Sequence, residues 1–496
     1  MIQKVRGTRD ILPPESRLWV EVEAVAQRVF GGFGYQEIRL PLLEPTELFV
    51  RSVGEATDIV GKEMYTFADR KGRSLTLRPE GTASVARAFI ENGLAQRPSP
   101  LRLSYLGPMF RYEKMQRGRY RQFAQIGIEL LGAATPEADV EVVLALHTFL
   151  AELGFDDLVT VLNNLGDPED RPRFIEQLLG ELGPHRDELC ADCRRRWEAN
   201  PLRILDCKVP RCRELVAGTT PVAEVVSEDA RRHVDAVEAM LRELGVEVRR
   251  APRLVRGLDY YLRTVFEVVS PELGEDTVIC GGGRYDRLIS DLGGPQVAGV
   301  GFAIGEDRLI EVLPEAFREQ VMGRRPVAVL PLGGGAAAPA LAIVRALAVR
   351  GIAAQAEVTG RSLKASLKWA AKLGGLPLAF IHKTRDTTRP NHAEAHGIIG
   401  DGKGRDCVVV DDMIATKPAF VVELQEVLPP ERVDELIAKH PPTADQKKAA
   451  AREGTRRLLF NEDTFPPAFL AESMVAIRLG DRRQEDLSAA EVTQLW

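Results

Sequence analysis

The stretch from Phe110 to Gly132, FRYEKMQRGRYRQFAQIGIELLG, places a strongly basic segment directly before an apolar one. The apolar run has the composition of a strand, and it still carries Gln125 and Glu129. On a strand, residues an even number of positions apart face the same way, so these two side chains would share one face. We therefore expect two strands joined by a loop rich in arginine.

The loop has the chemistry of a phosphate-binding site. Guanidinium groups bind phosphate through paired hydrogen bonds and keep their charge, and Phe123 offers a flat face for a base. A solvated, charged hairpin would have the same composition. One acid, Glu113, stands among five basic residues, which are Arg111, Lys114, Arg117, Arg119 and Arg121.

Four stretches together carry a family resemblance. The segment 110–132 resembles motif 2 of the class II aminoacyl-tRNA synthetases, in the version found in the histidyl-tRNA synthetase family. TLRPEGT at 76–82 resembles the amino-acid-binding loop of that family, LVRGLDYY at 254–261 its histidine-specific motif, and GVGFAIGEDR at 299–308 its motif 3. The resemblance covers roughly residues 1 to 375.

The resemblance implies an α+β fold. Residues 1–322 would form a catalytic domain with a mainly antiparallel sheet flanked by helices and a helical insertion at about 168–240. A helix at 16–30, with Ser16 as its N-cap, and a strand at 35–40 match motif 1, which contributes to a homodimer interface in this family. Residues 325–420 would form an α/β domain that resembles the family's anticodon-binding domain, followed by an irregular tail over 421–496.

The activity implied is ATP-dependent conversion of L-histidine to histidyl-adenylate, followed by transfer to the 3′ end of tRNA(His). Arg256 and Arg111 would be catalytic, and Mg²⁺ would accompany the phosphates of ATP. The residues expected to bind ATP are Arg111, Glu113, Arg119, Arg121, Phe123 and Arg308. Those expected to bind histidine are Glu80, Gly81, Thr82, Arg111, Gln125, Glu129, Arg256, Tyr260 and Tyr261.

Within this set, Arg111 would hold the α-phosphate, Glu113 would orient the adenine amino group and Arg308 would bind the γ-phosphate. The segment GGGRYD, with Arg284, resembles a second element of histidine specificity. In motif 3, the small residue Gly301 would allow close approach to the nucleotide.

The overall charge does not indicate a nucleic-acid partner. The formal net charge is −6, so contacts with tRNA must come from local basic patches. The N-terminus has no apolar segment typical of a secretory signal, and no run of about 18 apolar residues suggests a membrane span. We expect a cytoplasmic protein without membrane contact.

Four of the six cysteines fall inside the expected insertion. Cys190 and Cys193 are separated by two residues, and Cys207 and Cys212 by four, a spacing typical of structural zinc sites. Small buried thiols, or the remnant of a lost site, would give the same pattern. The expected role of zinc is structural, because the implied reaction needs no metal there.

After residue 376 the resemblance changes. The segment 378–416 resembles part of ribose-phosphate pyrophosphokinase, with Asp411 and Asp412 in its phosphoribosyl pyrophosphate loop. Lys417, Pro418 and Ala419 stand where that loop has glycines. Two alternative functions follow, a regulatory subunit of ATP phosphoribosyltransferase and a hybrid that binds phosphoribosyl pyrophosphate. The first usually lacks an intact histidine motif, and the second would need a complete second fold.

Overall fold

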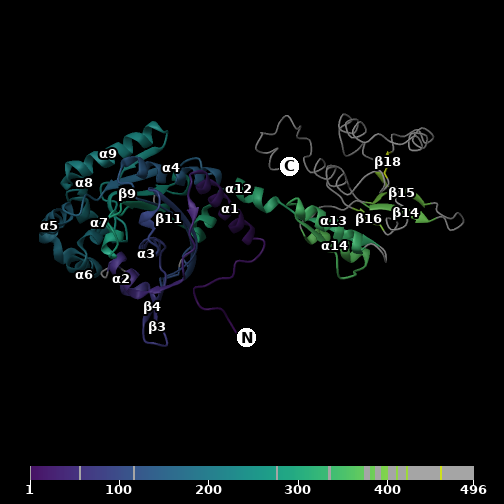
Figure 1. Cartoon of the computed structure of the whole chain (residues 1–496), viewed down its shortest axis with the longest axis horizontal. Coiled ribbons are helices and arrows are strands. Elements are labelled where there is room, and N and C mark those ends of the chain that lie inside the picture. Colours follow the sequence, from purple (N-terminus) through teal and green to yellow (C-terminus); the bar gives the residue numbers. More distant parts are fainter. Residues whose placement is uncertain are drawn as a thin grey trace. The chain divides into compact units, whose positions relative to one another are not determined.

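A computed structural model gives the fold of the chain (Figure 1). It describes residues 2–332 except 55–56, 58, 116–117 and 275–276, then residues 337–373 and five short strands between 380 and 460. The chain forms two compact units, Met1–Met322 and Gly323–Trp496. No described helix is both long and apolar enough to cross a membrane.

The first unit is built on an eight-stranded sheet with the order β1-β5-β6-β11-β10-β9-β7-β8. The six central strands pair antiparallel, while β1 and β8 pair parallel to their neighbours at the two edges. The expected antiparallel core is therefore confirmed. The strands are β1 Gln36–Glu37, β5 Leu101–Phe110, β6 Gln122–Leu131, β7 Val159–Asn164, β8 Glu247–Arg250, β9 Leu262–Val269, β10 Val278–Arg284 and β11 Gly299–Gly305.

Helices cover one face of the sheet with its main apolar core. Leu18, Val22, Val25 and Val29 recur at helical spacing in α1 (Ser16–Gly32), so they share a stripe that packs on this face. The prediction that Ser16 caps α1 is wrong, because Glu15 holds the cap position and no side chain bonds the first turn. Helices α4 (Pro136–Glu152) and α9 (Glu228–Glu243) lie side by side here (Figure 1), with α11 (Glu306–Val312) in the same core.

The opposite face carries the site. Helices α3 (Thr82–Glu91) and α10 (Leu288–Asp291) pack there against Leu103, Tyr105 and Leu131 of the sheet. A small sheet of the order β2-β4-β3 leads into α3 and so positions the loop at 78–82. Its strands are β2 Leu43–Pro45, β3 Tyr65–Ala68 and β4 Ser74–Leu77, accompanied by α2 Thr46–Val53 and the π-helical turn η1 Ile59–Glu63.

The helical insertion has a core of its own, formed by residues such as Phe174, Leu178, Ile204 and Val216. Each of its helices buries only a narrow apolar stripe, so most of the remaining side chains are exposed and many of them are charged. The elements are α5 Asp170–Leu182, η3 Gly183–Glu188, α6 Ala191–Ala199, η4 Pro201–Ile204, α7 Pro210–Ala217 and α8 Val222–Val225.

The second unit begins with the expected alternation of strands and helices. Strand β12 pairs in parallel with β13 on one side and with β16 on the other. Asp411 ends β16, whereas Asp412 and residues 417–419 lie outside the described residues. The elements are β12 Val327–Leu332, α13 Ala337–Val349, β13 Ala354–Ala356, α14 Leu363–Lys372, β14 Phe380–Arg385, β15 Ala393–Ile399, β16 Val409–Asp411, β17 Phe420–Val422 and β18 Leu458–Phe460.

Candidate active site

The hairpin of β5 and β6 positions the residues expected from the basic stretch. The two strands pair in a register that sets Leu103 opposite Glu129 and Met109 opposite Phe123. Because side chains alternate along a strand, Phe123, Gln125 and Glu129 share the face that α3 covers. Gln125 and Glu129 are both buried there.

Glu129 lies at the centre of the buried polar cluster. Thr82 Oγ1 donates to Glu129 Oε1 at 2.7 Å, and the hydroxyl of Tyr285 donates to Oε2. Burial raises the pKa of Glu129 to about 8, although both hydrogen bonds favour its ionised form. With this pKa the protonated form of the carboxyl group predominates at pH 7, and the carboxylate form increases as the pH rises through about 8.

Gly301 makes room for Glu129, and its expected approach to the nucleotide stays a prediction. It lies directly opposite Glu129 in the pairing of β11 with β6. A Cβ atom at this position would overlap Oε2 of Glu129 and the carbonyl of Ile128. Glycine at 301 therefore makes room for the Glu129 carboxylate. This requirement cannot be inferred from motif 3 alone, because Glu129 lies on another strand.

The loop before α3 fixes Glu80. The backbone N–H groups of Thr82 and Ala83 donate to the two Glu80 carboxylate oxygens at 2.7 and 2.8 Å. Burial raises the pKa of Glu80, while these donors and the charge of Arg111 oppose the increase. Gly81 is required here because a Cβ atom would overlap the ring of Tyr105. The carboxylate is thus held in one orientation at the N-terminus of α3.

Aromatic side chains enclose the cluster. The rings of Tyr260 and Tyr261 lie 4.7 Å apart between centroids, and Tyr285 meets Tyr260 edge to face at 5.7 Å. Tyr105 packs in the same cluster. Tyr105 and Tyr285 were not expected from the sequence, although Tyr285 stands beside the residue chosen in GGGRYD.

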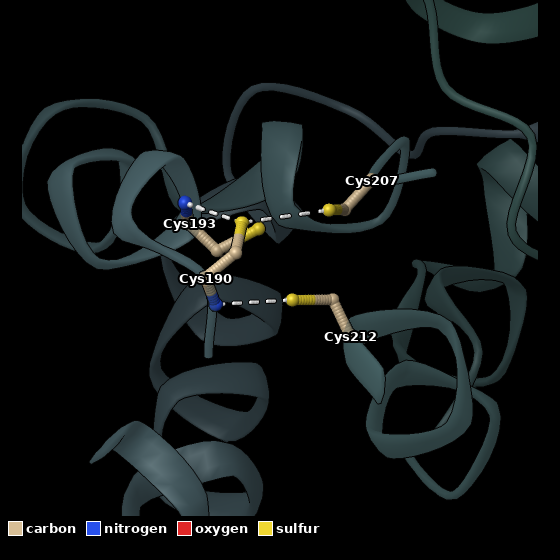
Figure 2. A group of neighbouring side chains, drawn as sticks. All are labelled: Cys190, Cys193, Cys207 and Cys212. Carbon is tan, nitrogen blue, oxygen red and sulfur yellow. Dashed lines mark hydrogen bonds between the residues drawn. The ribbon is translucent and has the colours of Figure 1, made fainter. Parts of the chain in front are cut away.

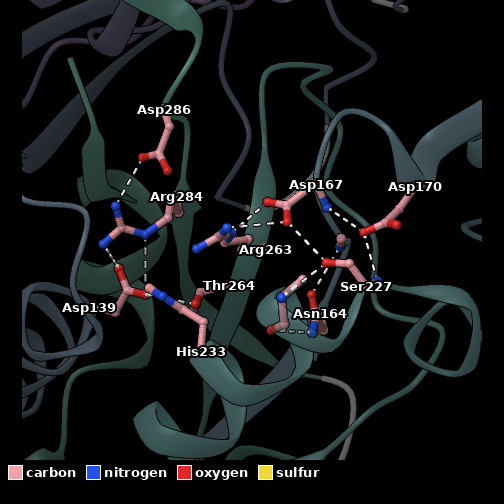
Figure 3. Close-up of polar contacts among 12 residues, drawn as sticks. Asp139, Asn164, Asp167, Asp170, Ser227, His233, Arg263, Thr264, Arg284 and Asp286 are labelled. Atoms are coloured by element: carbon pink, nitrogen blue, oxygen red, sulfur yellow. Dashed lines mark hydrogen bonds and ion pairs between the residues drawn. The ribbon is translucent and has the colours of Figure 1, made fainter. Parts of the chain in front are cut away.

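Arg284 of GGGRYD lies among Asp139, Asp286 and His233 (Figure 3). Its guanidinium is fully buried and pairs with Asp139 at 2.6 Å and with Asp286 at 2.9 Å. His233 and Thr264 complete the contacts of Asp139, at 2.6 and 2.7 Å. Arg284 therefore ties β10 to α4 and α9, while its neighbour Tyr285 reaches the site.

Arg256 enters the site from the loop before β9. Burial alone would lower its pKa, but its ion pair with Glu267 raises it, so the guanidinium stays charged. A Cβ atom at Gly281 would overlap this guanidinium, so glycine in β10 leaves the space that Arg256 occupies. Arg256 is held between β9 and β10 with a fixed orientation.

Several polar atoms of this cluster are buried without a partner among the described residues. They include Arg256 Nε and Gln125 Oε1. The hydroxyls of Tyr105 and Tyr260 lie near Thr82 but form no hydrogen bond of good geometry. Because unpaired buried polar groups are costly, this arrangement suits a small polar ligand that would supply the partners.

The basic loop approaches α11. Arg111 donates from Nε to the carbonyl of Pro79 at 2.8 Å and lies 5.3 Å from the centre of the Phe123 ring. Burial lowers the pKa of Arg308, and the nearby charge of Arg119 lowers it further. Two guanidinium groups held near each other favour a polyphosphate between them.

The remaining two residues of the expected ATP set lie at the edge of this loop. Glu113 pairs with Arg119 at 3.6 Å. Arg121 stacks its guanidinium 3.6 Å from the centre of the Tyr112 ring and reaches the carbonyl of Arg6 at 3.5 Å. Arg121 thus contacts the N-terminal segment, and its role with ATP stays a prediction.

Known proteins resemble this chain over most of its length. A sequence model of the histidyl-tRNA synthetase family matches residues 7–189 and 211–309. The histidine–tRNA ligase of Desulforudis audaxviator is 48% identical over 384 residues, which are 77% of this chain and 91% of that protein. The histidine–tRNA ligase of Desulforapulum autotrophicum is 46% identical over 391 residues, or 79% and 92% of the two chains.

A solved structure agrees with these relatives. The apo histidyl-tRNA synthetase of S. aureus superposes with a TM-score of 0.63 and 32% identity, covering 84% of this chain and 94% of that one. These relatives do not favour the alternative of a regulatory subunit of ATP phosphoribosyltransferase.

Proposed function

Because this chain belongs to the histidyl-tRNA synthetase family and is a histidine–tRNA ligase, we propose that the residues around Glu129 and Arg256 carry out its reaction. The observation that carries this assignment is the buried cluster of Glu129, Gln125 and Arg256, with polar atoms that a bound amino acid would satisfy.

Glu129 and Gln125 would recognise the imidazole of L-histidine. The carboxylate of Glu129 would accept an imidazole N–H group, and Gln125 Oε1 offers a second acceptor. Tyr260 and Tyr261 would enclose the ring, and Glu80, with Gly81 and Thr82 in its loop, would bind the α-ammonium group. Backbone N–H groups already orient Glu80, so little reorganisation is needed when the ammonium arrives.

ATP would bind across the basic loop. Phe123 would stack on the adenine, Glu113 would orient its amino group, and Arg308 would hold the γ-phosphate. Arg119 and Arg121 would add positive charge around the phosphates. Arg111 would bind both the α-phosphate of ATP and the carboxylate of histidine, and so bring the two reactants together. Holding both reactants in place removes much of the entropic barrier to their reaction.

In the first step, a carboxylate oxygen of histidine attacks the α-phosphorus of ATP. A phosphorus–oxygen bond forms, the bond to the bridging oxygen breaks, and pyrophosphate leaves with the bonding electrons. Arg256 would stabilise the negative charge that develops at the α-phosphate. In the second step, a ribose hydroxyl of the terminal adenosine of tRNA attacks the acyl carbon, and AMP leaves.

The proposal includes several partners of this chemistry. Mg²⁺ would neutralise the phosphates of ATP, as is usual in phosphoryl chemistry. The tRNA would be tRNA(His), and the protein would be a cytoplasmic homodimer, because the family serves protein synthesis and motif 1 is its dimer element. A structural zinc ion bound by the four cysteines would lie outside the reaction.

Histidine-dependent exchange of radioactive pyrophosphate into ATP tests the first step directly. The wild-type chain should support exchange with L-histidine and ATP, whereas Glu129→Gln should lose it through weaker histidine binding. Arg39→Gln is a matched exposed control, because Arg39 pairs with Glu37 outside the cluster. Absence of exchange in folded wild-type protein would contradict the assignment.

A further inference from the structure

The four cysteines of the insertion come together in the folded chain (Figure 2). Cys190 caps α6, Cys193 lies in its first turn, Cys207 follows η4, and Cys212 lies in α7. Their sulfur atoms all lie within 4.8 Å of one another, and all of them except Cys190 are buried. Two short sequence pairs therefore converge on one point.

The separation of the sulfur atoms fits a metal and not a disulfide. Cys190 Sγ and Cys207 Sγ lie 3.8 Å apart, and all four thiols are free. A disulfide would need a distance of about 2.05 Å. Four sulfur atoms at about 2.3 Å from a tetrahedral zinc ion stand roughly 3.8 Å from one another. The observed spacing is that of one edge of such a tetrahedron.

The backbone around the cluster also favours thiolates. The N–H of Cys190 donates to Cys212 Sγ at 3.3 Å, and the N–H of Cys193 donates to Cys190 Sγ at 3.4 Å. Donors aimed at sulfur stabilise its negative charge and fix the direction of a metal ligand. Neutral thiols that served only to fill a core would gain little from this arrangement.

Three of the four cysteines lie in a stretch that the family model leaves unmatched. The family model matches residues 7–189 and 211–309, so the unmatched stretch 190–210 contains Cys190, Cys193 and Cys207. We propose that Cys190, Cys193, Cys207 and Cys212 bind one structural zinc ion, which holds the segment between the two cysteine pairs against the loop of Arg256. Four protein ligands leave no open position for substrate, as in other structural zinc sites.

The segment between the cysteine pairs touches the histidine motif. Asn200 Nδ2 donates to Asp259 Oδ1 at 2.6 Å, and a terminal nitrogen of Arg203 donates to the carbonyl of Gly257 at 3.2 Å. Gly257 and Asp259 belong to LVRGLDYY, between Arg256 and Tyr260. Zinc would fix both ends of the segment that makes these bonds, so it acts as a positioning element for Arg256.

Hydrogen bonds supplement the packing at this contact. A cavity of about 30 Å³ remains between the insertion and the loop, lined by Phe174 and Leu202 on one side and by Arg256 and Tyr261 on the other. The hydrogen bonds of Asn200 and Arg203 act at this contact together with that of Arg171 in α5, which donates to the carbonyl of Asp259 at 2.9 Å. A segment fixed at both ends makes such bonds at a lower entropic cost.

Metal analysis tests the site itself, independently of the proposed function. Protein purified without chelator or polyhistidine tag should contain about one zinc ion per chain by mass spectrometry. A mercurial that modifies thiols should release this zinc to a chromogenic chelator. Cys207→Ala should lose the metal, whereas Cys280→Ala, which removes a buried thiol outside the cluster, should keep it. Protein without zinc, or with stoichiometric iron, would overturn the zinc site.

Kinetics tests the positioning role, which rests on the proposed function. Asn200→Ala should keep its zinc and lower kcat/KM for histidine in pyrophosphate exchange about tenfold, the usual effect of losing a hydrogen bond to a charged group. Arg195→Ala is the control in the helix that Asn200 caps, because Arg195 pairs with Asp192 at the surface. Zinc-free protein, made by Cys207→Ala or by mercurial stripping followed by reduction, should show a similar loss.

The outcomes separate the two claims. An unchanged kcat/KM in folded, zinc-free protein would overturn the positioning role. Zinc-loaded wild-type protein without exchange activity would instead contradict the proposed function and leave the metal site standing.

Discussion

The hydroxyl of Tyr285 donates a hydrogen bond to Oε2 of Glu129, between residues 156 positions apart in the sequence. Tyr285 follows β10, while Glu129 lies on β6, and β11 separates the two strands. Glycine at 301 on β11 gives the carboxylate room to reach across. Residues on or next to three strands therefore orient the Glu129 carboxylate, which would bind the imidazole of histidine.

The first prediction concerns this hydrogen bond. The bond favours the ionised form of Glu129, whose pKa burial raises to about 8. Because a carboxylate accepts an imidazole N–H better than a carboxylic acid does, kcat/KM for histidine should rise with pH through about 8. Tyr285→Phe should move this inflection to higher pH and raise KM for histidine about tenfold.

Pyrophosphate exchange measured between about pH 6 and 9.5, a range that brackets the pKa of Glu129, would check this. Tyr35→Phe is the matched control, because Tyr35 also donates to a glutamate, Glu141 at 3.2 Å, but in the core on the other face of the sheet. A profile that is identical in wild type and Tyr285→Phe would contradict the role assigned to this bond.

The second prediction concerns Arg256. Arg256→Ala should slow adenylate formation by about 10²–10³, with a smaller effect on ATP binding, because a preorganised charge at the α-phosphate is lost. Gly281→Ala should act in the same direction, since the added methyl group would occupy the space of the Arg256 guanidinium. Single-turnover formation of adenylate measures both effects.

Gly180→Ala provides the control for the glycine substitution, because a Cβ atom there meets no neighbour within 4 Å. Near-normal rates in Arg256→Ala would remove this residue from the mechanism. Normal rates in Gly281→Ala would show that the guanidinium tolerates displacement.

Much of this site could be predicted from local sequence, because its parts are local. The alternation of β6 placed Gln125 and Glu129 on one face, and the resemblance of TLRPEGT indicated Glu80, although not the backbone N–H groups that hold its carboxylate. The role of Gly301 could not be predicted, since it depends on which residue of another strand lies opposite. That Tyr285 and not Arg284 reaches the cluster could not be predicted for a similar reason, because Asp139, the buried partner of Arg284, is distant in sequence.

The third prediction concerns stability at high pH. Glu306 is fully buried beside Glu23 and Asp307, neither of its carboxylate oxygens has a described hydrogen-bond partner, and burial raises its pKa to about 9. The pKa of Glu306 is higher in the folded state than in the unfolded state. Its contribution to the free energy of unfolding is therefore fully present below about pH 4.5 and is lost as the pH rises toward 9. The loss at pH 7 is on the order of 3 kcal/mol.

Glu306→Gln should therefore raise the melting temperature of the first unit at pH 8 and flatten its dependence on pH. Calorimetry at pH values of about 5, 7 and 9 would measure the difference across this window. Glu315→Gln, at an exposed position of α12 (Glu315–Gly323), should leave the profile unchanged. A parallel pH profile in wild type and Glu306→Gln would exclude this linkage.

The fourth prediction is that the segment resembling ribose-phosphate pyrophosphokinase has no catalytic activity of its own. Asp411 ends β16, where the pairing with β12 sets it opposite Leu332, so an acid does stand at a strand end. A 5′-phosphate, however, needs several converging backbone N–H groups, the arrangement that a glycine-rich turn provides. Pro418 lacks an N–H group, and Lys417 and Ala419 add Cβ atoms where glycine allows close approach.

Calorimetric titration with phosphoribosyl pyrophosphate should therefore show at most weak binding, and the chain should not transfer pyrophosphate to ribose 5-phosphate. A single ammonium group, which Lys417 could supply, is a poor substitute for several converging backbone donors. The double variant Asp411→Ala with Asp412→Ala should titrate like wild type and keep its histidine-dependent exchange. Micromolar binding in wild type that disappears in the double variant would show that the two acids form a working ribose site.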